Sequence, residues 1–212
     1  MSADASLADA YLTQLRAGRR EVLGLLFEHY RERLWRMLYL RMDARLTSRL
    51  SPEDVLQEAY LEAARRLPDY LAQAEVPFYV WLRFLTLQRL AQLQRHHLGA
   101  ARRDVGREQS LHALASPSAD SLAGQLVGHL TSPSQAAIRG EWHEQLRNAL
   151  ESMDPLDREV LALRHFEDMS NAEVAQALGL HKDAASKRYV RALVRLREIL
   201  GSPTDSRSGD HP

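Results

Sequence analysis

The stretch SNAEVAQALGL, residues 170–180, decides how the C-terminal third of this chain folds. Ser170 and Glu173 stand three residues apart, the spacing of a capping box in which each side chain accepts a free backbone N–H at a helix start. Ala175 is small enough to let a neighbouring helix approach closely, and Gly179 suits the left-handed conformation that ends a helix. The stretch therefore predicts a short helix, a tight turn and a second helix packed against the first.

A strongly basic segment follows the turn. Between Lys182 and Arg197 there are six basic residues and one acid, Asp183. Helical spacing predicts an apolar inner face of Ala185, Tyr189, Leu193 and Leu196, and an outer face that carries Lys182, Ser186, Lys187, Arg188 and Arg191. An apolar back and a cationic front are what a helix needs to enter the major groove of DNA. An ordinary helical hairpin with a solvated basic face is the alternative, but the combined signals favour a helix-turn-helix DNA-binding module over residues 154–200.

Composition places the whole chain in the all-α class. Leu, Ala, Arg and Glu dominate its 212 residues, and no long run of alternating β-branched residues is present. The lack of cysteine excludes disulfides and thiolate zinc sites, and no metal or other cofactor is expected. No segment has the roughly 18 apolar residues that a membrane span needs, and residues 1–9 lack a signal-peptide pattern. We therefore expect a soluble cytoplasmic protein without a membrane partner.

Helix signals divide the chain into two small helical domains joined by a flexible linker. In the first domain, helices are predicted at residues 7–15, 22–38, 51–67 and 77–97. Pro68 is expected to end the third of these helices. The following segment is rich in Ser, Ala and Gly, with room for one short helix. The expected organisation is a first domain at residues 7–103, a linker at 104–131, a second domain at 132–200 and a disordered tail at 201–212.

One face of the helix predicted at residues 51–67 combines acids with a leucine. Residues 51–64 contain four acids and no base. The residues that fall at helical spacing opposite the apolar stripe are Asp54, Gln57, Glu58, Leu61 and Arg65. A solvated surface is the ordinary interpretation of such a face. A leucine among acids is also compatible with a surface for a partner helix, and periodicity alone does not separate the two.

The next predicted helix is basic and aromatic. Residues 76–103 contain five arginines and no acid, and four aromatic residues stand within seven positions: Phe78, Tyr79, Trp81 and Phe84. Aromatic rings beside arginines can hold unstacked bases and the phosphates of a single strand. The alternative is that the rings belong to the core, which we favour for Trp81. The better candidates for contact with nucleic acid are Arg83, Gln88, Arg89 and Arg95.

Three segments, taken in chain order, resemble a bacterial sigma factor of the extracytoplasmic-function (ECF) type, which retains only regions 2 and 4. Residues 54–60, DVLQEAY, resemble the region 2 helix that docks on the clamp helices of the RNA polymerase β′ subunit. Residues 81–89, WLRFLTLQR, resemble the part that melts and reads the −10 promoter element, and residues 157–197 resemble region 4, which reads the −35 element. The chain departs from the family at Gln88 and Gln92, where Asn and Asp are frequent, and at Ala185, where a larger aliphatic residue is usual.

The resemblance implies a sigma factor that binds core RNA polymerase and directs promoter recognition and transcription initiation. It places polymerase binding on Asp54, Gln57, Glu58, Leu61 and Arg65, −10 contacts on Arg83, Gln88, Arg89 and Arg95, and −35 contacts on Lys182, Ser186, Lys187, Arg188 and Arg191. The implied partners are the β′ clamp helices and the β flap of polymerase, promoter DNA and an anti-sigma factor. No catalytic residue is implied.

Two other functional classes fit the pattern less well. A helix-turn-helix regulator would bind DNA as a dimer without polymerase, and it would need neither the acidic face nor the basic aromatic helix. An enzyme is disfavoured because His143-Glu144 begins like a zinc-protease helix but Arg147 replaces the second histidine. The chain also has neither a phosphate-binding glycine loop nor a nucleophile elbow.

Overall fold

The computed structural model describes residues 3–43, 46, 49–99, 117–130 and 136–201. Every regular element within these ranges is helical, which confirms the all-α prediction. The helices are α1 (Ala3–Arg16), α2 (Val22–Arg41), α3 (Pro52–Ala72), α4 (Phe78–Gly99), α6 (Ala119–Leu130), α7 (Ala136–Glu151), α8 (Pro155–His165), α9 (Asn171–Leu178) and α10 (Lys182–Gly201). None of the helices in the described ranges combines the length and apolarity required of a membrane span.

The helix boundaries follow local capping chemistry. α9 begins with the predicted capping box, in which Ser170 Oγ accepts from the Glu173 N–H while the Glu173 carboxylate accepts from the Ser170 N–H. It ends at Gly179, whose φ of 64° is left-handed. A second capping box starts α3, where Ser51 is paired with Asp54. These ends are confirmed because a cap depends on a few neighbouring residues.

The predicted end of α3 at Pro68 is wrong, because the helix continues to Ala72. Pro68 removes one backbone donor from the helix. The turn around it is retained by burial of Leu67 and Tyr70 in the core. The Tyr70 hydroxyl also donates to the carbonyl of Val76 at 2.9 Å, which ties this end of α3 to the start of α4. Packing therefore outweighs the local signal.

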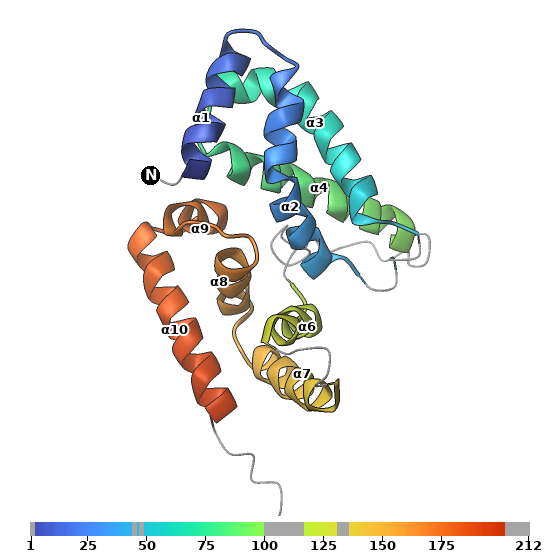
Figure 1. Cartoon of the computed structure of the whole chain (residues 1–212), viewed down its shortest axis with the longest axis vertical. Helices are drawn as coiled ribbons and strands as arrows, with labels where there is room; N and C mark the ends of the chain where they lie inside the picture. Colours follow the sequence, from blue (N-terminus) through green and yellow to red (C-terminus); the bar gives the residue numbers. More distant parts are fainter. Residues whose placement is uncertain (1–2, 44–45, 47–48, 100–116, 131–135, 202–212) are drawn as a thin grey trace, which may run out of the picture.

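Helices α1 to α4 form the upper part of the molecule in Figure 1. Their shared core contains Leu26, Leu34 and Met37 of α2, packed against α3 and α4. Aromatic rings extend this core, with Tyr30 of α2 5.2 Å from Tyr79 of α4 between ring centroids. These contacts hold α4 against α2 and α3.

Helices α6 to α10 form the lower part of Figure 1. The single short helix expected within residues 104–131 is α6, which lies alongside α7. A second core cluster joins this pair to α8 and α10 through Leu122, Leu150, Leu161 and Ala192. The boundary predicted between the linker and the second domain, at residues 131 and 132, lies outside the described residues.

The two groups of helices are in direct contact. Val160 and Leu163 of α8, together with Val174 of α9, belong to the same core cluster as the residues of α2 and α4. In the other direction, Leu40 of α2 packs in the cluster formed by α6, α7 and α8. The helix-turn-helix therefore packs against the N-terminal helices in this structure. One face of α4 forms part of this contact.

Candidate nucleic-acid and polymerase interfaces

The basic face of α10 is presented to solvent. Lys182, Ser186, Lys187 and Arg191 are all exposed. On the opposite side of the helix Ala185 and Ala192 are fully buried, so their small side chains set how closely α10 packs. Ala185 is therefore a packing residue, and its side chain is not part of the exposed face of α10. Leu193 was expected to point inward but is 37% exposed, because Ala192 occupies the inner position instead.

Arg188 differs from the other basic residues of α10. Its Nη1 lies 2.7 Å from Asp157 Oδ1 and 3.6 Å from Asp154 Oδ1, both at the start of α8. The side chain is half-buried, so it connects α10 to α8. The structure thus brings four of the five predicted −35 residues to one open face and directs the fifth toward a neighbouring helix.

Further contacts hold α10 against α8 and α9. The Asn171 side chain donates to the carbonyl of Lys182 at 3.0 Å. The Tyr189 hydroxyl lies 3.2 Å from His165 Nε2, and the Arg164 guanidinium lies over the Tyr189 ring. Burial and the neighbouring Arg164 charge lower the pKa of His165, so this imidazole is neutral near pH 7.

The predicted polymerase-docking face of α3 is exposed. Gln57, Glu58, Leu61 and Arg65 all reach solvent, and Leu61 is 62% exposed. Beside them lies a groove of about 420 Å³ between α2 and α3, lined by Phe27, Arg31, Glu53, Leu56, Gln57, Tyr60 and Leu61. A groove next to an exposed leucine and an acid can receive an amphipathic helix with a basic edge.

Asp54 has a structural role on the same helix. Its Oδ2 accepts hydrogen bonds from the backbone N–H and the hydroxyl of Ser51, at 2.9 and 2.8 Å. These bonds, led by the one from the backbone, lower the pKa of Asp54. The carboxylate is therefore part of the α3 cap, and its replacement would disturb the helix start as well as the surface.

Glu62 is a site residue that the sequence did not reveal. Its carboxylate accepts hydrogen bonds from Arg65 and Arg89 and forms an ion pair with Arg66. The hydrogen bond from Arg65 is the largest of the effects that lower the pKa of Glu62 to about 2, against the opposing effect of burial. Arg65 and Arg89, predicted to contact polymerase and DNA respectively, thus meet at one carboxylate. The arginines three and four positions after Glu62 were the available signal.

The residues predicted to contact the −10 element lie in different environments along α4. Arg95 is exposed, whereas Gln88 and Arg89 are half-buried. Arg83 is only 5% exposed. Of the four aromatic residues, Phe78 and Tyr79 are buried in the core, whereas Phe84 is 47% exposed.

Trp81 and Phe84 line a second groove, of about 390 Å³, between α4 and α9. Gln176 and Leu178 of α9, with Gly179 at its C-terminal end, form the opposite side of the groove. Trp81 also stacks on Tyr70, with 4.6 Å between ring centroids, so it is anchored in the core by one face as expected. The aromatic side chains that remain accessible on α4 therefore face the helix-turn-helix.

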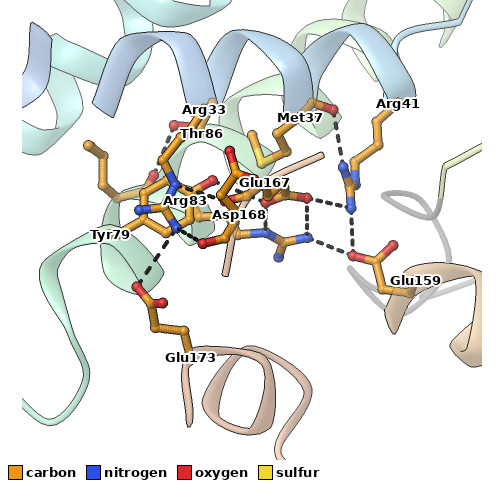
Figure 2. Close-up of polar contacts among 11 residues, drawn as sticks. Arg33, Met37, Arg41, Tyr79, Arg83, Thr86, Glu159, Glu167, Asp168 and Glu173 are labelled. Atoms are coloured by element: carbon orange, nitrogen blue, oxygen red, sulfur yellow. Dashed lines mark hydrogen bonds and ion pairs between the residues drawn. The ribbon is translucent and has the colours of Figure 1, made fainter. Parts of the chain in front are cut away.

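Arg83 belongs to a buried ionic cluster between the two groups of helices (Figure 2). Its Nε donates to Glu167 Oε2 at 2.7 Å and its Nη2 donates to Glu159 Oε1 at 2.6 Å. Arg41 of α2 approaches the same two carboxylates, at 2.8 Å from Glu167 and 2.6 Å from Glu159. Two cations from the N-terminal helices therefore face two anions from the helix-turn-helix.

Charge within the cluster outweighs burial at Glu167. Burial opposes its ionisation, but Arg83 and Arg41, with hydrogen bonds from Arg83 and Tyr79, lower its pKa overall. Burial and the adjacent Glu167 charge raise the pKa of Tyr79 well above its usual value, so its hydroxyl stays protonated and donates to Glu167. The Glu167 carboxylate is therefore ionised near neutral pH.

Further contacts surround the cluster, as Figure 2 shows. The Arg33 guanidinium lies 3.7 Å from the centroid of the Tyr79 ring and donates to the carbonyl of Glu167 at 2.8 Å. At the edge, Arg36 forms an ion pair with Asp168 at 2.8 Å. Asp168 has a φ of 48°, a left-handed conformation in the α8–α9 turn. Sequence reasoning did not identify Glu159 or Glu167.

The tight turn between α9 and α10 and the exposed cationic face of α10 are the features of a helix-turn-helix protein. Residues 143–196 match the family model "Sigma-70, region 4". The chain is 30% identical over 200 residues to the ECF RNA polymerase sigma factor SigD of Mycobacterium tuberculosis, covering 93% of this chain and 85% of SigD. The chain therefore belongs to the ECF type of RNA polymerase sigma factors, which are non-catalytic transcription initiation factors.

Two further similarities agree with this assignment. The ECF sigma factor BldN of Streptomyces coelicolor is 26% identical over 191 residues, which are 90% of this chain and 64% of BldN. The solved structure of CnrH in complex with the cytosolic domain of CnrY matches with a TM-score of 0.50 and 22% identity, over 96% of this chain and 100% of that chain. The second likeness concerns the fold.

Proposed function

We propose that this chain binds core RNA polymerase through α3 and directs it to promoters, with α10 reading the −35 element and α4 capturing the −10 strand. The observation that carries the proposal is the exposed face of α10, where Lys182, Ser186, Lys187 and Arg191 stand together. The buried Ala185 and Ala192 lie on the opposite side of α10, which leaves this face clear of the rest of the protein. The groove and exposed Leu61 on α3 support a separate docking surface for polymerase.

The −35 assignment is tested with Lys187→Ala and Arg191→Ala on a promoter found by run-off transcription of genomic DNA. A residue that contacts phosphate should weaken binding to all sequences and reduce the salt dependence by about one ion. A residue that contacts a base should cost about 1–3 kcal/mol on the promoter and relax its specificity. Fluorescence anisotropy over a range of salt concentrations separates the two roles.

The matched control is Arg147→Ala, which removes a partly exposed cation on α7 that pairs with Glu151. We expect its affinity for the −35 duplex to stay within about twofold of the unchanged protein, because Arg147 does not lie on the basic face of α10. Unchanged promoter affinity in both the Lys187 and the Arg191 variant would contradict the assignment of α10 to the −35 element.

We also propose that an anti-sigma factor binds this chain. The support is membership of the ECF type, together with the fold shared with CnrH, which was solved with the cytosolic domain of CnrY. Such a partner would compete with polymerase for the chain. Co-purification from the native host, followed by displacement with core polymerase, tests this part of the proposal.

A further inference from the structure

We propose that Glu159 and Glu167 act as an internal mimic of DNA phosphates, which holds the free protein in a closed state that must open before the −10 strand can bind. This inference rests on the proposed function, because it concerns the same α4 surface. It adds a regulatory contact between the two halves of the chain.

The two carboxylates bind the guanidinium of Arg83, which is predicted to contact DNA. Arg83 donates to Glu159 and Glu167 through Nη2 and Nε, a geometry in which two oxygen anions satisfy one planar fork of donors. Phosphate oxygens would use the same donors. Because Arg83 is buried by these contacts, the closed arrangement and a contact between Arg83 and a nucleic-acid strand exclude each other.

The closed arrangement also places α9 across a groove from the accessible aromatic side chains of α4. Trp81 and Phe84 line the groove whose far side is formed by α9. Bases stacking on these rings would need the space next to Gln176 and Gly179. One docking contact therefore obstructs both the charge and the aromatic surface that a single strand would use.

The −35 reading face is left open in the same arrangement. Lys182, Lys187 and Arg191 are exposed on α10, on a helix whose buried side faces α7, α8 and α9. The closed state is thus expected to hinder binding of the −10 strand while permitting binding of the −35 duplex. This asymmetry distinguishes it from a general loss of DNA binding.

The cluster is built so that it can separate. Buried ion pairs give up hydration on both sides, and their net contribution is small compared with that of apolar contacts of similar size. Among the residues that the structure describes, Arg41 Nε and Glu159 Oε2 are buried without a hydrogen-bond partner. Separation would hydrate both atoms, and the edge pair Arg36–Asp168 is already partly exposed. A competing set of phosphates, or polymerase bound to α3, can therefore shift the balance.

The test uses the full chain, which lacks cysteine and so accepts two labels at chosen sites. Asp9→Cys and Ala172→Cys place fluorophores at exposed positions of α1 and α9, which line one groove between the two groups of helices. We expect high energy transfer in the free protein and lower transfer after Glu159→Gln plus Glu167→Gln. The affinity for a single-stranded −10 oligonucleotide should rise about tenfold, the gain when the open state rises from about 10% to nearly all molecules. The −35 duplex affinity should stay unchanged.

Two additional variants keep the test decisive if the buried double variant folds poorly. Arg36→Gln plus Asp168→Asn removes only the exposed edge pair, and Asn tolerates the left-handed conformation of residue 168. This variant should lower the energy transfer and raise the affinity for the −10 oligonucleotide, both by smaller factors than the Glu159 and Glu167 double variant. Glu151→Gln, which removes an exposed pair with Arg147, is the matched control and should change neither quantity. Circular dichroism verifies that helix content is retained.

The outcomes separate the inference from the proposed function. Adding Arg83→Gln to the open variant should abolish its gain in −10 binding, because the released guanidinium makes the contact. The inference is overturned if the labelled free protein already shows low transfer, or if the open variants gain no −10 affinity while polymerase holoenzyme initiates normally. Failure of the protein to support any initiation with core polymerase would instead contradict the proposed function.

Discussion

Glu62 gathers three guanidinium groups from α3 and α4 around one carboxylate. Each pair involving a partly exposed arginine contributes about 0.2–1 kcal/mol. We therefore expect Glu62→Gln to lower the free energy of unfolding by about 1–2 kcal/mol, measured by urea denaturation at pH 7. Asp69→Asn, an exposed acid on the same helix, serves as the control and should change stability by less than about 0.5 kcal/mol.

The pH dependence of this contribution has a definite sign. The pKa of Glu62 falls from 4.5 to about 2 in the folded protein. A lowered folded-state pKa means that the contribution is fully present above pH 4.5 and is lost as the pH falls toward 2. The difference in stability between the native chain and Glu62→Gln should therefore shrink across that window. A difference that stays constant down to pH 2 would contradict the ion-pair role.

Which cations remain available to DNA could not be predicted from the sequence. The acid-free segment at residues 76–103 correctly marks α4 as basic, but the acids that neutralise Arg83 lie 76 and 84 residues further along the chain. Arg188 likewise meets Asp157, 31 residues earlier. Such pairings depend on how helices dock, which helical periodicity does not encode. The exposed face of Lys182, Ser186, Lys187 and Arg191 was predictable because it needs only the period of one helix.

At the scale of elements, the turn between α9 and α10 depends on Gly179. Its φ of 64° is left-handed, and a side chain there costs roughly 1–2 kcal/mol even though a Cβ would have free space around it. Gly140 lies within α7, where a Cβ also meets nothing within 4 Å. We predict that Gly179→Ala destabilises the protein by about 1 kcal/mol, whereas Gly140→Ala stabilises it by about 0.5–1 kcal/mol. Thermal unfolding measures both, and equal effects would contradict the turn assignment.

Helix starts and stops were largely predictable because caps act over three or four residues. The capping box at Ser170 was visible as a spacing and is present, and the helix start predicted at residue 51 is confirmed by a capping box there. Pro68 was the exception. The helix continues past it because Leu67 and Tyr70 are buried, and that burial depends on the tertiary core. Local chemistry therefore predicts an element's start more reliably than a stop that packing can override.

At the scale of the whole molecule, the two predicted domains are held together by direct contacts between their helices, in addition to the connecting chain. The buried cluster of Arg41, Arg83, Glu159 and Glu167 lies between them, and apolar residues of α8 and α9 extend the N-terminal core. Single-sequence patterns did not single out Glu159 or Glu167. If α4 contacts the −10 strand as we propose, this contact makes access to α4 depend on how the two groups of helices sit, whereas the basic face of α10 is exposed.

The most direct test of the central claim is run-off transcription with purified core polymerase. The protein is expected to produce defined transcripts that core polymerase alone does not produce. Glu58→Ala plus Leu61→Ala should reduce these transcripts at least about tenfold while leaving binding of the −35 duplex intact, and Asp54 is spared because it caps α3. Asp69→Ala should behave as the unchanged protein. Full transcription by the double variant would contradict the docking assignment, and no promoter-specific transcript from the unchanged protein would contradict the proposed function itself.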